Sequence, residues 1–420
     1  MQKIRLGVIY GGPSVEHEIA VISASQAMSA ADPAKYEVIP IYISKDGQWY
    51  TGQKLLDIAA YADMPALLRD CTRVHMADDR GEHKLVTKAK GWFAKPQEIA
   101  LDVILPVMHG AHGEDGCLQG FLELLNIPYA GPGVLAAAVG MDKIMMKNIL
   151  AANGLPVLDA VWFTAEEWFG GREAKIAEIE NRLGYPVIVK PADLGSSVGI
   201  AKAADAAELA AALDDAASFS RRLLIEPCLE DMREINCSVL GYGSKLRASV
   251  CEEPLTDSAF LTYQDKYMGG GSAKGGVKGG KMACATKMSQ PAKGAAGAKS
   301  GGMSSARRRI PADLTPERTQ EIQQVSQRAF VALDGCGVAR IDVMIDNTQD
   351  KVYVNEINTI PGSLSFYLWQ ESGLDFTGLI DELVESALWR QRNKEKLVYS
   401  YDTNILASFA GGGMGVKGAK

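Results

Sequence analysis

The segment that most constrains the fold spans residues 340–362, with the sequence RIDVMIDNTQDKVYVNEINTIPG. Two apolar, β-branched runs flank a polar turn at residues 347–350, which predicts a β-hairpin. Successive strand side chains alternate between faces, so Glu356 and Asn358 share one face, and folding about the turn brings Asp342 close to Glu356. Two carboxylates and an amide oxygen suit Mg²⁺. We therefore expect a metal site here; the alternative is a solvated acidic strand face.

Composition places the chain among ordinary globular proteins. Its 420 residues are 47% hydrophobic and 23% charged, which predicts two or three domains with sizeable cores. No apolar run reaches membrane-spanning length and the N-terminus lacks the form of a signal peptide, so we expect a cytoplasmic protein without membrane insertion. The net charge of −7 argues against general nucleic-acid binding. The seven cysteines are scattered without a CxxC pair, which predicts reduced thiols.

Residues 268–310 differ from the rest of the chain. They contain six lysines, three arginines and no acid, and they are rich in Gly, Ala and Ser. Such a segment buries too little surface to order itself, so we expect a mobile insert; we also expect a flexible tail at 396–420, whose last residues, 410–420, have the same composition. Gly275–Lys281 matches the spacing GxxxxGK, but Met282 stands where a Ser or Thr is needed. We interpret that match as chance.

The ordered parts form three blocks, at 1–130, 131–228 and 229–395. In the first block strands alternate with helices, which predicts a doubly wound parallel sheet whose ligands bind beyond the carboxyl ends of strands. Expected strands are Ile4–Tyr10, Glu37–Ile43, Val103–Met108, Tyr185–Pro191, Arg233–Leu240 and Leu246–Glu252; expected helices begin near Glu16 and span Val134–Asn153 and Asp375–Asn393.

A glycine- and serine-rich loop lies between two expected strands in VIVKPADLGSSVGIAKA, residues 187–203. Lys190 ends the first strand, and the loop's backbone N–H groups and the hydroxyls of Ser196 and Ser197 can surround phosphate oxygens. The alternative is a plain glycine-rich hairpin. Together with the acidic hairpin, the loop predicts a nucleoside triphosphate site.

Two further loops follow strands of the first block. In HGAHGEDGCLQG, His109 is a candidate contact for a substrate carboxylate, and zinc binding is the weaker interpretation; Glu114 and Asp115 are expected to cap the helix that follows. GGPSVEHEI lacks the GxGxxG fingerprint, which argues against a hydride-transfer enzyme. Its acids, Glu16 and Glu18, are candidates for an ammonium contact, or simply interact with the helix dipole.

Taken together, these motifs resemble the D-alanine–D-alanine ligase family of the ATP-grasp fold. The resemblance covers about residues 1–395 without the basic insert, and its motifs occur in the family's order: GGPSVEHE, HGAHGEDGCLQG, MDK, VIVKPADLGSSVGI, TYQDKY, ARIDVMID and NEINTIPG. It implies an α/β protein of three domains, in which an N-terminal doubly wound sheet accompanies two α+β domains that clamp ATP. It also implies a homodimer that joins two D-alanines for peptidoglycan synthesis, using ATP and two Mg²⁺ or Mn²⁺ ions.

The resemblance also implies a role for each matching residue. Glu16, Ser196, Arg340, Gly362 and Tyr267 are expected to be catalytic. Expected substrate contacts are Glu16, His109, Lys266, Tyr367 and Leu368. Expected ATP contacts are Lys143, Lys190, Ser196, Ser197, Glu226, Cys228, Leu229, Glu234 and Lys266. Expected metal ligands are Asp342, Glu356 and Asn358. Arg340 and the Gly362 N–H are expected to stabilise the oxyanion.

The chain departs from the family pattern at Tyr367, where typical members carry a Ser that binds the carboxylate of the second substrate. D-Serine therefore stays open as the second substrate, whereas Tyr267 favours a D-amino acid over D-lactate. A different ATP-grasp carboxylate–amine ligase would differ in GGPSVEHE and TYQDKY. A non-catalytic nucleotide-binding module would be expected to lack an acid of the hairpin or the arginine.

Overall fold

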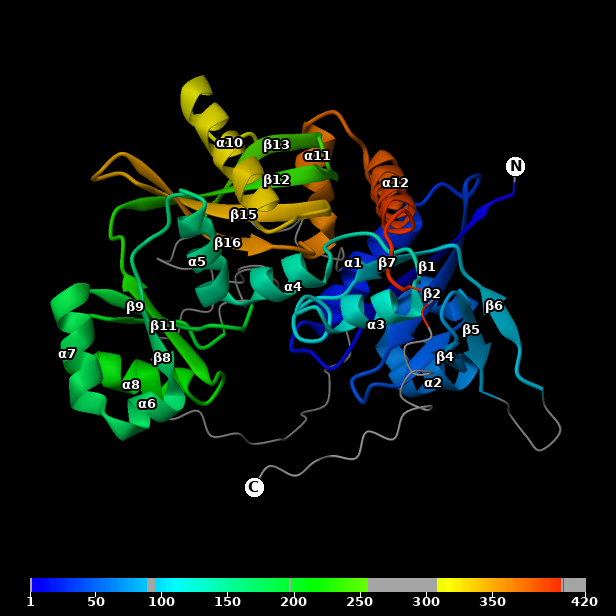
Figure 1. Ribbon diagram of the computed structural model, residues 1–420, viewed down its shortest axis with the longest axis horizontal. Coiled ribbons are helices and arrows are strands. Elements are labelled where there is room, and N and C mark those ends of the chain that lie inside the picture. Colours follow the sequence, from blue (N-terminus) through cyan, green and yellow to red (C-terminus); the bar gives the residue numbers. More distant parts are fainter. Residues whose placement is uncertain (1, 89–94, 196–197, 256–307, 402, 404–420) are drawn as a thin grey trace, which may run out of the picture.

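Three β-sheets organise the protein, and each is built from one of the three blocks that the sequence predicts (Figure 1). The structure is a computed structural model that describes residues 2–88, 95–195, 198–255, 308–401 and 403. Most of the predicted basic insert and of the predicted tail lies outside these ranges. The use of the three blocks as separate domains stays a prediction.

The first sheet has seven strands in the order β6-β5-β4-β3-β2-β1-β7. β1 pairs in parallel with β2 and β7, and these are the three strands expected from the sequence. From β2 outward, each strand is antiparallel to its neighbour. This extension was not predicted, because its strands are too short to show a clear pattern. The strands are β1 (Ile4–Gly11), β2 (Tyr36–Ile43), β3 (Trp49–Thr51), β4 (Thr72–Met76), β5 (Lys84–Thr87), β6 (Glu98–Ala100) and β7 (Val103–Val107).

Helices cover both faces of the parallel part of this sheet. The side chains of β1 alternate between the faces: Leu6 and Val8 share a core cluster with α1 (His17–Ala30), and Ile9 shares another with α3 (Cys117–Leu125). Because β1 and β7 are parallel, the loops that follow them open at the same edge of the sheet, as expected for a doubly wound sheet. Shorter helices at the edge are η1 (Gln53–Leu56), η2 (Ile58–Asp63) and α2 (Met64–Asp70).

The second sheet is antiparallel, with the strand order β10-β9-β11-β8. Helices pack against it through one buried cluster that includes Trp168, Ile179 and Leu213. These elements form the lobe at the lower left of Figure 1. They are β8 (Val161–Thr164), α6 (Ala165–Gly170), α7 (Arg172–Arg182), β9 (Val187–Pro191), β10 (Ala201–Ala203), α8 (Ala206–Ala216) and β11 (Arg222–Pro227).

The third sheet is antiparallel with the order β14-β13-β12-β15-β16 and contains the predicted hairpin. Helix α12 carries Leu379 and Leu383 into the cluster that also holds residues of β1 and β7, so it joins this sheet to the first. The elements are β12 (Met232–Tyr242), β13 (Lys245–Pro254), β14 (Arg308–Arg309), α10 (Pro316–Ala332), β15 (Gly337–Asp346), β16 (Lys351–Asn358), η4 (Gly362–Ser365), α11 (Phe366–Glu371) and α12 (Phe376–Lys394).

The single helix predicted over Val134–Asn153 is wrong. Two helices form instead, α4 (Val134–Met141) and α5 (Lys143–Ala152), because Asp142 leaves the helical conformation and its side chain accepts hydrogen bonds from the backbone N–H groups of the first turn of α5. Buried residues of α5 pack in the core of the third sheet. The break places Lys143 at the first position of α5.

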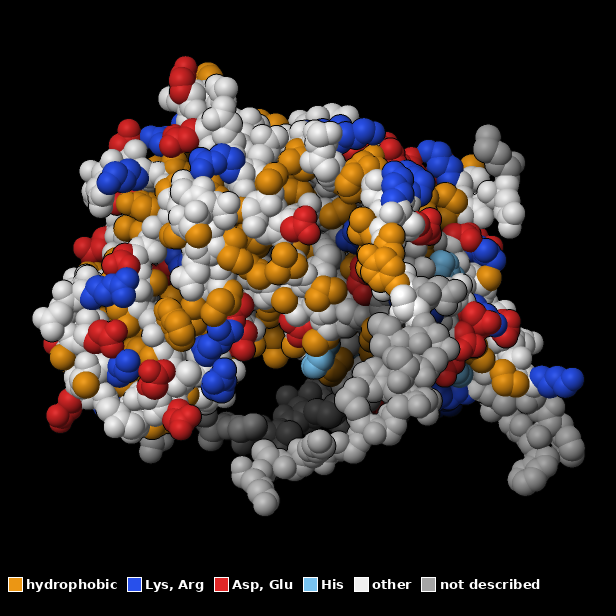
Figure 2. Space-filling view, viewed as in Figure 1, with side chains coloured by type: hydrophobic (Ala, Val, Ile, Leu, Met, Phe, Trp, Pro, Cys, Tyr) orange, Lys and Arg blue, Asp and Glu red, His pale blue; other side chains and the backbone are white. Residues whose placement is uncertain are grey.

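The remaining expectations concern thiols, charge and membranes. The six cysteines in the described ranges are all free, and Cys284 lies outside those ranges. Basic and acidic side chains are interspersed on the face shown in Figure 2, and a recess opens at the lower edge beside the lobe of the second sheet. Within the described ranges, no helix combines the length and the apolar character needed to span a bilayer.

Candidate active site

The predicted hairpin is formed by β15 and β16. Asp342 pairs with Glu356 across the two strands, and Arg340 pairs with Asn358, so the side chains expected to converge do so. The register then shifts, since Val343 pairs with Val354, which inserts Asn355 as an additional residue on β16. The sequence pattern did not reveal this bulge.

Arg340 binds Asp342 through two hydrogen bonds. Its Nε and Nη2 atoms donate to the two carboxylate oxygens at 2.6 and 2.7 Å, and Asn358 Nδ2 donates to Asp342 Oδ2 at 3.0 Å. Both members of the pair are buried, and burial disfavours the charged guanidinium, but the carboxylate of Asp342 outweighs this and raises the pKa of Arg340. The sequence hypothesis gave Arg340 a task away from the metal ligands, whereas here it neutralises one of them.

The donor set of the hairpin fits a hard divalent cation. Asp342 and Glu356 are carboxylates on paired strands, and the amide of Asn358 already reaches Asp342. In the part of the chain that the structure describes, no cluster of three or more His, Cys, Asp and Glu side chains is arranged for a metal. The hairpin therefore offers two carboxylates and one amide oxygen to such a cation.

A row of polar side chains continues from the hairpin across the third sheet. Asn236 on β12 pairs with Asp342 on one side and with Glu252 of β13 on the other. Its Nδ2 donates to Glu252 Oε1 at 2.9 Å, and the hydroxyl of Tyr367 donates to the same oxygen at 3.2 Å. Arg308 binds Glu252 Oε2 at 3.2 Å and lies 4.2 Å from the centre of the Tyr367 ring.

The donor hydrogen of Tyr367 is therefore engaged by Glu252. Burial and the charge of Glu252 raise the pKa of this phenol to about 12, so it stays protonated. Leu368, the neighbouring expected contact, has a fully buried side chain. Asn236 and Glu252 were not among the expected site residues. Their signal in the sequence was a polar residue inside an otherwise apolar strand, because a buried polar group needs a hydrogen-bond partner.

The acid expected to bind an ammonium group is buried at the start of α1. Glu16 is 6% exposed, and the backbones of Gly110 and Gly195 lie against its carboxylate: a Cβ on Gly195 would lie 3.1 Å from Glu16 Oε2. Its competitor, Glu18, instead forms an exposed ion pair with Lys45 at 2.5 Å. Loops after β1, β7 and β9 thus meet around the carboxylate of Glu16.

His109 connects this pocket to the segment after the hairpin. Its Nε2 lies 3.0 Å from Ser23 Oγ, which accepts a hydrogen bond from the Ser363 N–H at 2.9 Å. Burial lowers the pKa of His109 to about 4, so the imidazole is neutral at neutral pH. Ser363, Leu364 and Ser365 have φ angles of 51–52°, a rare left-handed run beside the expected oxyanion residue Gly362.

The helix-capping role expected of Glu114 is wrong, and Asp115 contacts the first turn of α3 from outside the helix, since Gly116 is the N-cap residue. Asp115 Oδ1 accepts from the Cys117 N–H at 3.0 Å. Glu114 instead accepts from the N–H groups of Gly110 and Ile360, at 2.8 and 3.2 Å, and so joins the first block to the hairpin. Burial and the nearby charge of Glu16 raise the pKa of Glu114.

The residues expected to bind ATP gather between the second and third sheets. Lys143 Nζ donates to Leu194 O at 2.5 Å, which holds it at the glycine-rich loop. Lys190 Nζ lies 2.5 Å from Glu226 Oε2 and donates to Asn355 Oδ1 of the hairpin at 3.1 Å. The charges of Glu226, Glu356 and Glu234 outweigh the effect of burial and raise the pKa of Lys190. Cys228, Leu229 and Glu234 are half-buried.

One charged residue at this end was not predicted. Lys147, on α5, is buried and pairs with Glu226 Oε1. The available signal was its spacing, because it follows Lys143 by one helical turn. Four expected site residues, Ser196, Ser197, Lys266 and Tyr267, lie outside the described residues.

The fold, with the side chains that it brings together at the hairpin, at Glu16 and at Glu226, defines an ATP-grasp ligase. The family model described as "D-ala D-ala ligase N-terminus" matches residues 5–132. The family model described as "D-ala D-ala ligase C-terminus" matches residues 149–290 and 297–385. The chain belongs to the D-alanine–D-alanine ligase family.

Curated relatives and solved structures agree with this assignment. The D-alanine–D-alanine ligase of Bacillus cytotoxicus is 38% identical over 411 residues, which cover 95% of this chain and 100% of the relative. The ligase from Coxiella burnetii has a TM-score of 0.72 at 30% identity, covering 94% of this chain and 97% of that one. The VanG D-Ala:D-Ser ligase from Enterococcus faecalis has a TM-score of 0.73 at 28% identity, covering 92% and 100%.

Proposed function

We propose that this chain joins two D-alanine molecules to D-alanyl-D-alanine with hydrolysis of ATP to ADP and phosphate, as a step in peptidoglycan precursor synthesis. The observation that carries the proposal is the meeting of three loops around Glu16, together with the contact that Lys190, paired with Glu226, makes to Asn355 of the hairpin. Such a site can hold an amino acid and a nucleotide against the same acidic strands.

The first step transfers the γ-phosphoryl group of ATP. A carboxylate oxygen of the first D-alanine bonds to the γ-phosphorus, the bond to the ADP oxygen breaks, and D-alanyl phosphate forms. Lys143 and Lys190 counter the phosphate charge. Glu16 holds the ammonium group of the substrate. Asp342, Glu356 and Asn358 would hold Mg²⁺ or Mn²⁺, which neutralises phosphate charge when bound; two such ions are proposed.

The second step forms the peptide bond. The amine of the second D-alanine, after losing a proton, attacks the acyl carbon, and the tetrahedral oxygen takes up negative charge. Arg340 and the Gly362 N–H are placed to donate to that oxygen, and phosphate leaves as the carbonyl re-forms. Arg340 uses two of its five N–H donors on Asp342, which leaves others for the developing oxyanion.

Tyr367 and Glu252 form the proposed end of the second substrate's pocket. The phenol donates to Glu252 and lies under Arg308, so the pocket wall carries a cation beside a bulky ring. D-Alanine, with its small methyl side chain, is the proposed second substrate. We further propose a homodimer in the cytoplasm, where ATP is available.

The test is a phosphate-release assay with ATP and Mg²⁺, with products identified by mass. D-Alanine alone should give D-alanyl-D-alanine and one phosphate for each dipeptide, and L-alanine should give neither. Parallel reactions with added D-serine or D-lactate measure the choice of the second substrate. Absence of phosphate release with every D-amino acid would refute the proposal.

A further inference from the structure

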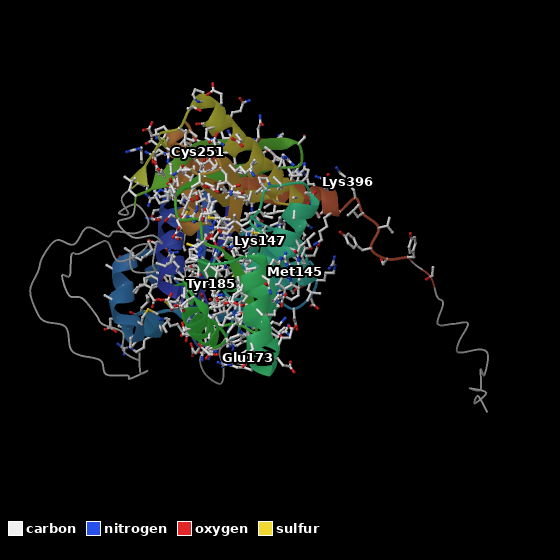
Figure 3. The ribbon with its side chains drawn as sticks, turned by 90° about the vertical axis from the view of Figure 1, so that its left-hand side faces the viewer. Met145, Lys147, Glu173, Tyr185, Cys251 and Lys396 are labelled. Carbon is white, nitrogen blue, oxygen red and sulfur yellow. The ribbon has the colours of Figure 1, made fainter. Side chains whose placement is uncertain are left out.

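Lys147 is a buried lysine that the proposed chemistry leaves without a task. Its side chain is 6% exposed, and that of its partner Glu226 is 1% exposed. Figure 3 shows Lys147 in the middle of the molecule, between the labelled Cys251 of the third sheet and Glu173 of α7, which matches the place of α5 between the sheets in Figure 1. A fully buried charge on a helix is costly to retain without a function or a partner.

Glu226 lies between two lysines. Lys147 contacts one carboxylate oxygen and Lys190 contacts the other, at 2.5 Å. Burial disfavours the carboxylate, but the charges of Lys190 and Lys147 outweigh it and lower the pKa of Glu226 to about 2. Glu226 is therefore ionised, and it can only accept hydrogen bonds.

The two lysines differ in what else they contact. Lys190 also donates to Asn355 of the hairpin, and its proposed role is to hold a phosphate of ATP. Lys147 enters from α5 on the opposite oxygen, and in the described part of the chain Glu226 is the one carboxylate within ion-pair distance of it. When Lys190 turns to a phosphate, Lys147 is the cation that stays with Glu226.

We propose that Lys147 is a positioning residue that keeps Glu226 ionised and oriented to accept a hydrogen bond from the 6-amino group of adenine. The enzyme thereby selects adenine nucleotides over purine nucleotides with a 6-oxo group, whose oxygen would face the carboxylate. This inference rests on the proposed nucleotide role of Glu226. Without Lys147, a carboxylate released by Lys190 would take up a proton, and a carboxylic acid can also donate to a 6-oxo group.

The test measures equilibrium binding of ADP and IDP, with Mg²⁺, to the full-length protein by calorimetry, so it does not depend on turnover. Lys147→Met should reduce the preference for ADP over IDP by about tenfold, as expected for the loss of a hydrogen bond to a charged group. Lys147→Arg should restore most of that preference. Lys245→Met, at an exposed lysine whose Nζ lies 3.7 Å from Glu385, is the matched control and should keep the wild-type preference.

Two further variants cover the remaining outcomes. If Lys147→Met does not fold, Lys147→Gln retains an N–H donor for Glu226 and should still lose part of the preference. An unchanged ADP:IDP ratio in the folded Lys147 variant overturns the inference, because a merely structural lysine would change stability alone. An unchanged ratio in Glu226→Gln also overturns it, while D-alanyl-D-alanine formation by the wild type would leave the proposed function intact.

Discussion

Arg340→Met tests how the arginine and a metal ion share Asp342. The substitution removes two hydrogen bonds of 2.6 and 2.7 Å from a carboxylate that is 1% exposed, while Asn358 Nδ2 stays 3.0 Å away. Removing one partner of a buried ion pair costs about 3–5 kcal/mol, because the remaining charge is left without its counter-ion. We expect a loss of that size in the metal-free protein.

The same substitution should increase the stabilisation by Mg²⁺. Asp342 without Arg340 is a stronger ligand, so part of the lost stability should return when Mg²⁺ and ADP are added; saturation at a hundredfold excess over Kd corresponds to about 2.7 kcal/mol. Turnover should nevertheless fall by about 10²–10³, the usual cost of removing one donor to an oxyanion. The Mg²⁺ response would therefore rise while catalysis falls.

The assay is urea unfolding of wild type, Arg340→Met, Asp342→Asn and the double variant, each with and without Mg²⁺ and ADP. The matched control is Arg182→Met, which breaks an Arg–Asp pair of 2.6 Å with side chains 52% and 58% exposed. It should cost less than about 1 kcal/mol. The reasoning fails if Arg340→Met costs no more than this control, or if Mg²⁺ and ADP stabilise it no more than they stabilise wild type.

Three other predictions concern the substrate pockets. His109 has a pKa of about 4 in the folded protein and an ordinary pKa of 6.5 in the unfolded chain, so the unfolded state binds more protons between these pH values. The free energy of unfolding should therefore fall by up to about 3 kcal/mol as the pH falls from 6.5 toward 4. Urea titrations of His109→Gln should lack this loss, and a pH profile identical to that of wild type would contradict the prediction. Gly195→Ala places a Cβ 3.1 Å from Glu16 Oε2, so the KM for D-alanine should rise roughly tenfold and by more than the KM for ATP; an unchanged KM for D-alanine would contradict it. Tyr367→Phe removes the bond to Glu252 and should cost about 1 kcal/mol, with a higher KM for the second D-alanine in steady-state assays; an unchanged KM would place that substrate elsewhere.

Local pattern was sufficient wherever one strand or one turn determines the geometry. The alternation of side chains placed Asp342 opposite Glu356, and the apolar runs located β1, β2 and β7. The helix break at Asp142 could also have been found from the sequence, since Asp is a preferred N-cap residue. The helical spacing of apolar residues on both sides of Asp142 outweighed this N-cap signal, and that spacing led to the prediction of a single helix.

The partners of charged groups were decided by the tertiary structure. Glu114 reaches Ile360, which is 246 residues away, and Lys147 meets Glu226 because α5 packs beside the second sheet. The bulge at Asn355 brings that side chain to Lys190, 165 residues earlier. No periodicity encodes such pairs, because each depends on how segments distant in the chain pack together.

The sequence by itself determined the strands β1, β2 and β7, the hairpin, the order of the motifs and the family, because these depend on local alternation and on residue types at set spacings. The tertiary structure decided that Glu114 reaches Ile360 and that Glu226 lies between two lysines. The physical reason is that a buried charge must find its counter-charge within a few ångströms. Which residue supplies it is fixed only when the three sheets have come together.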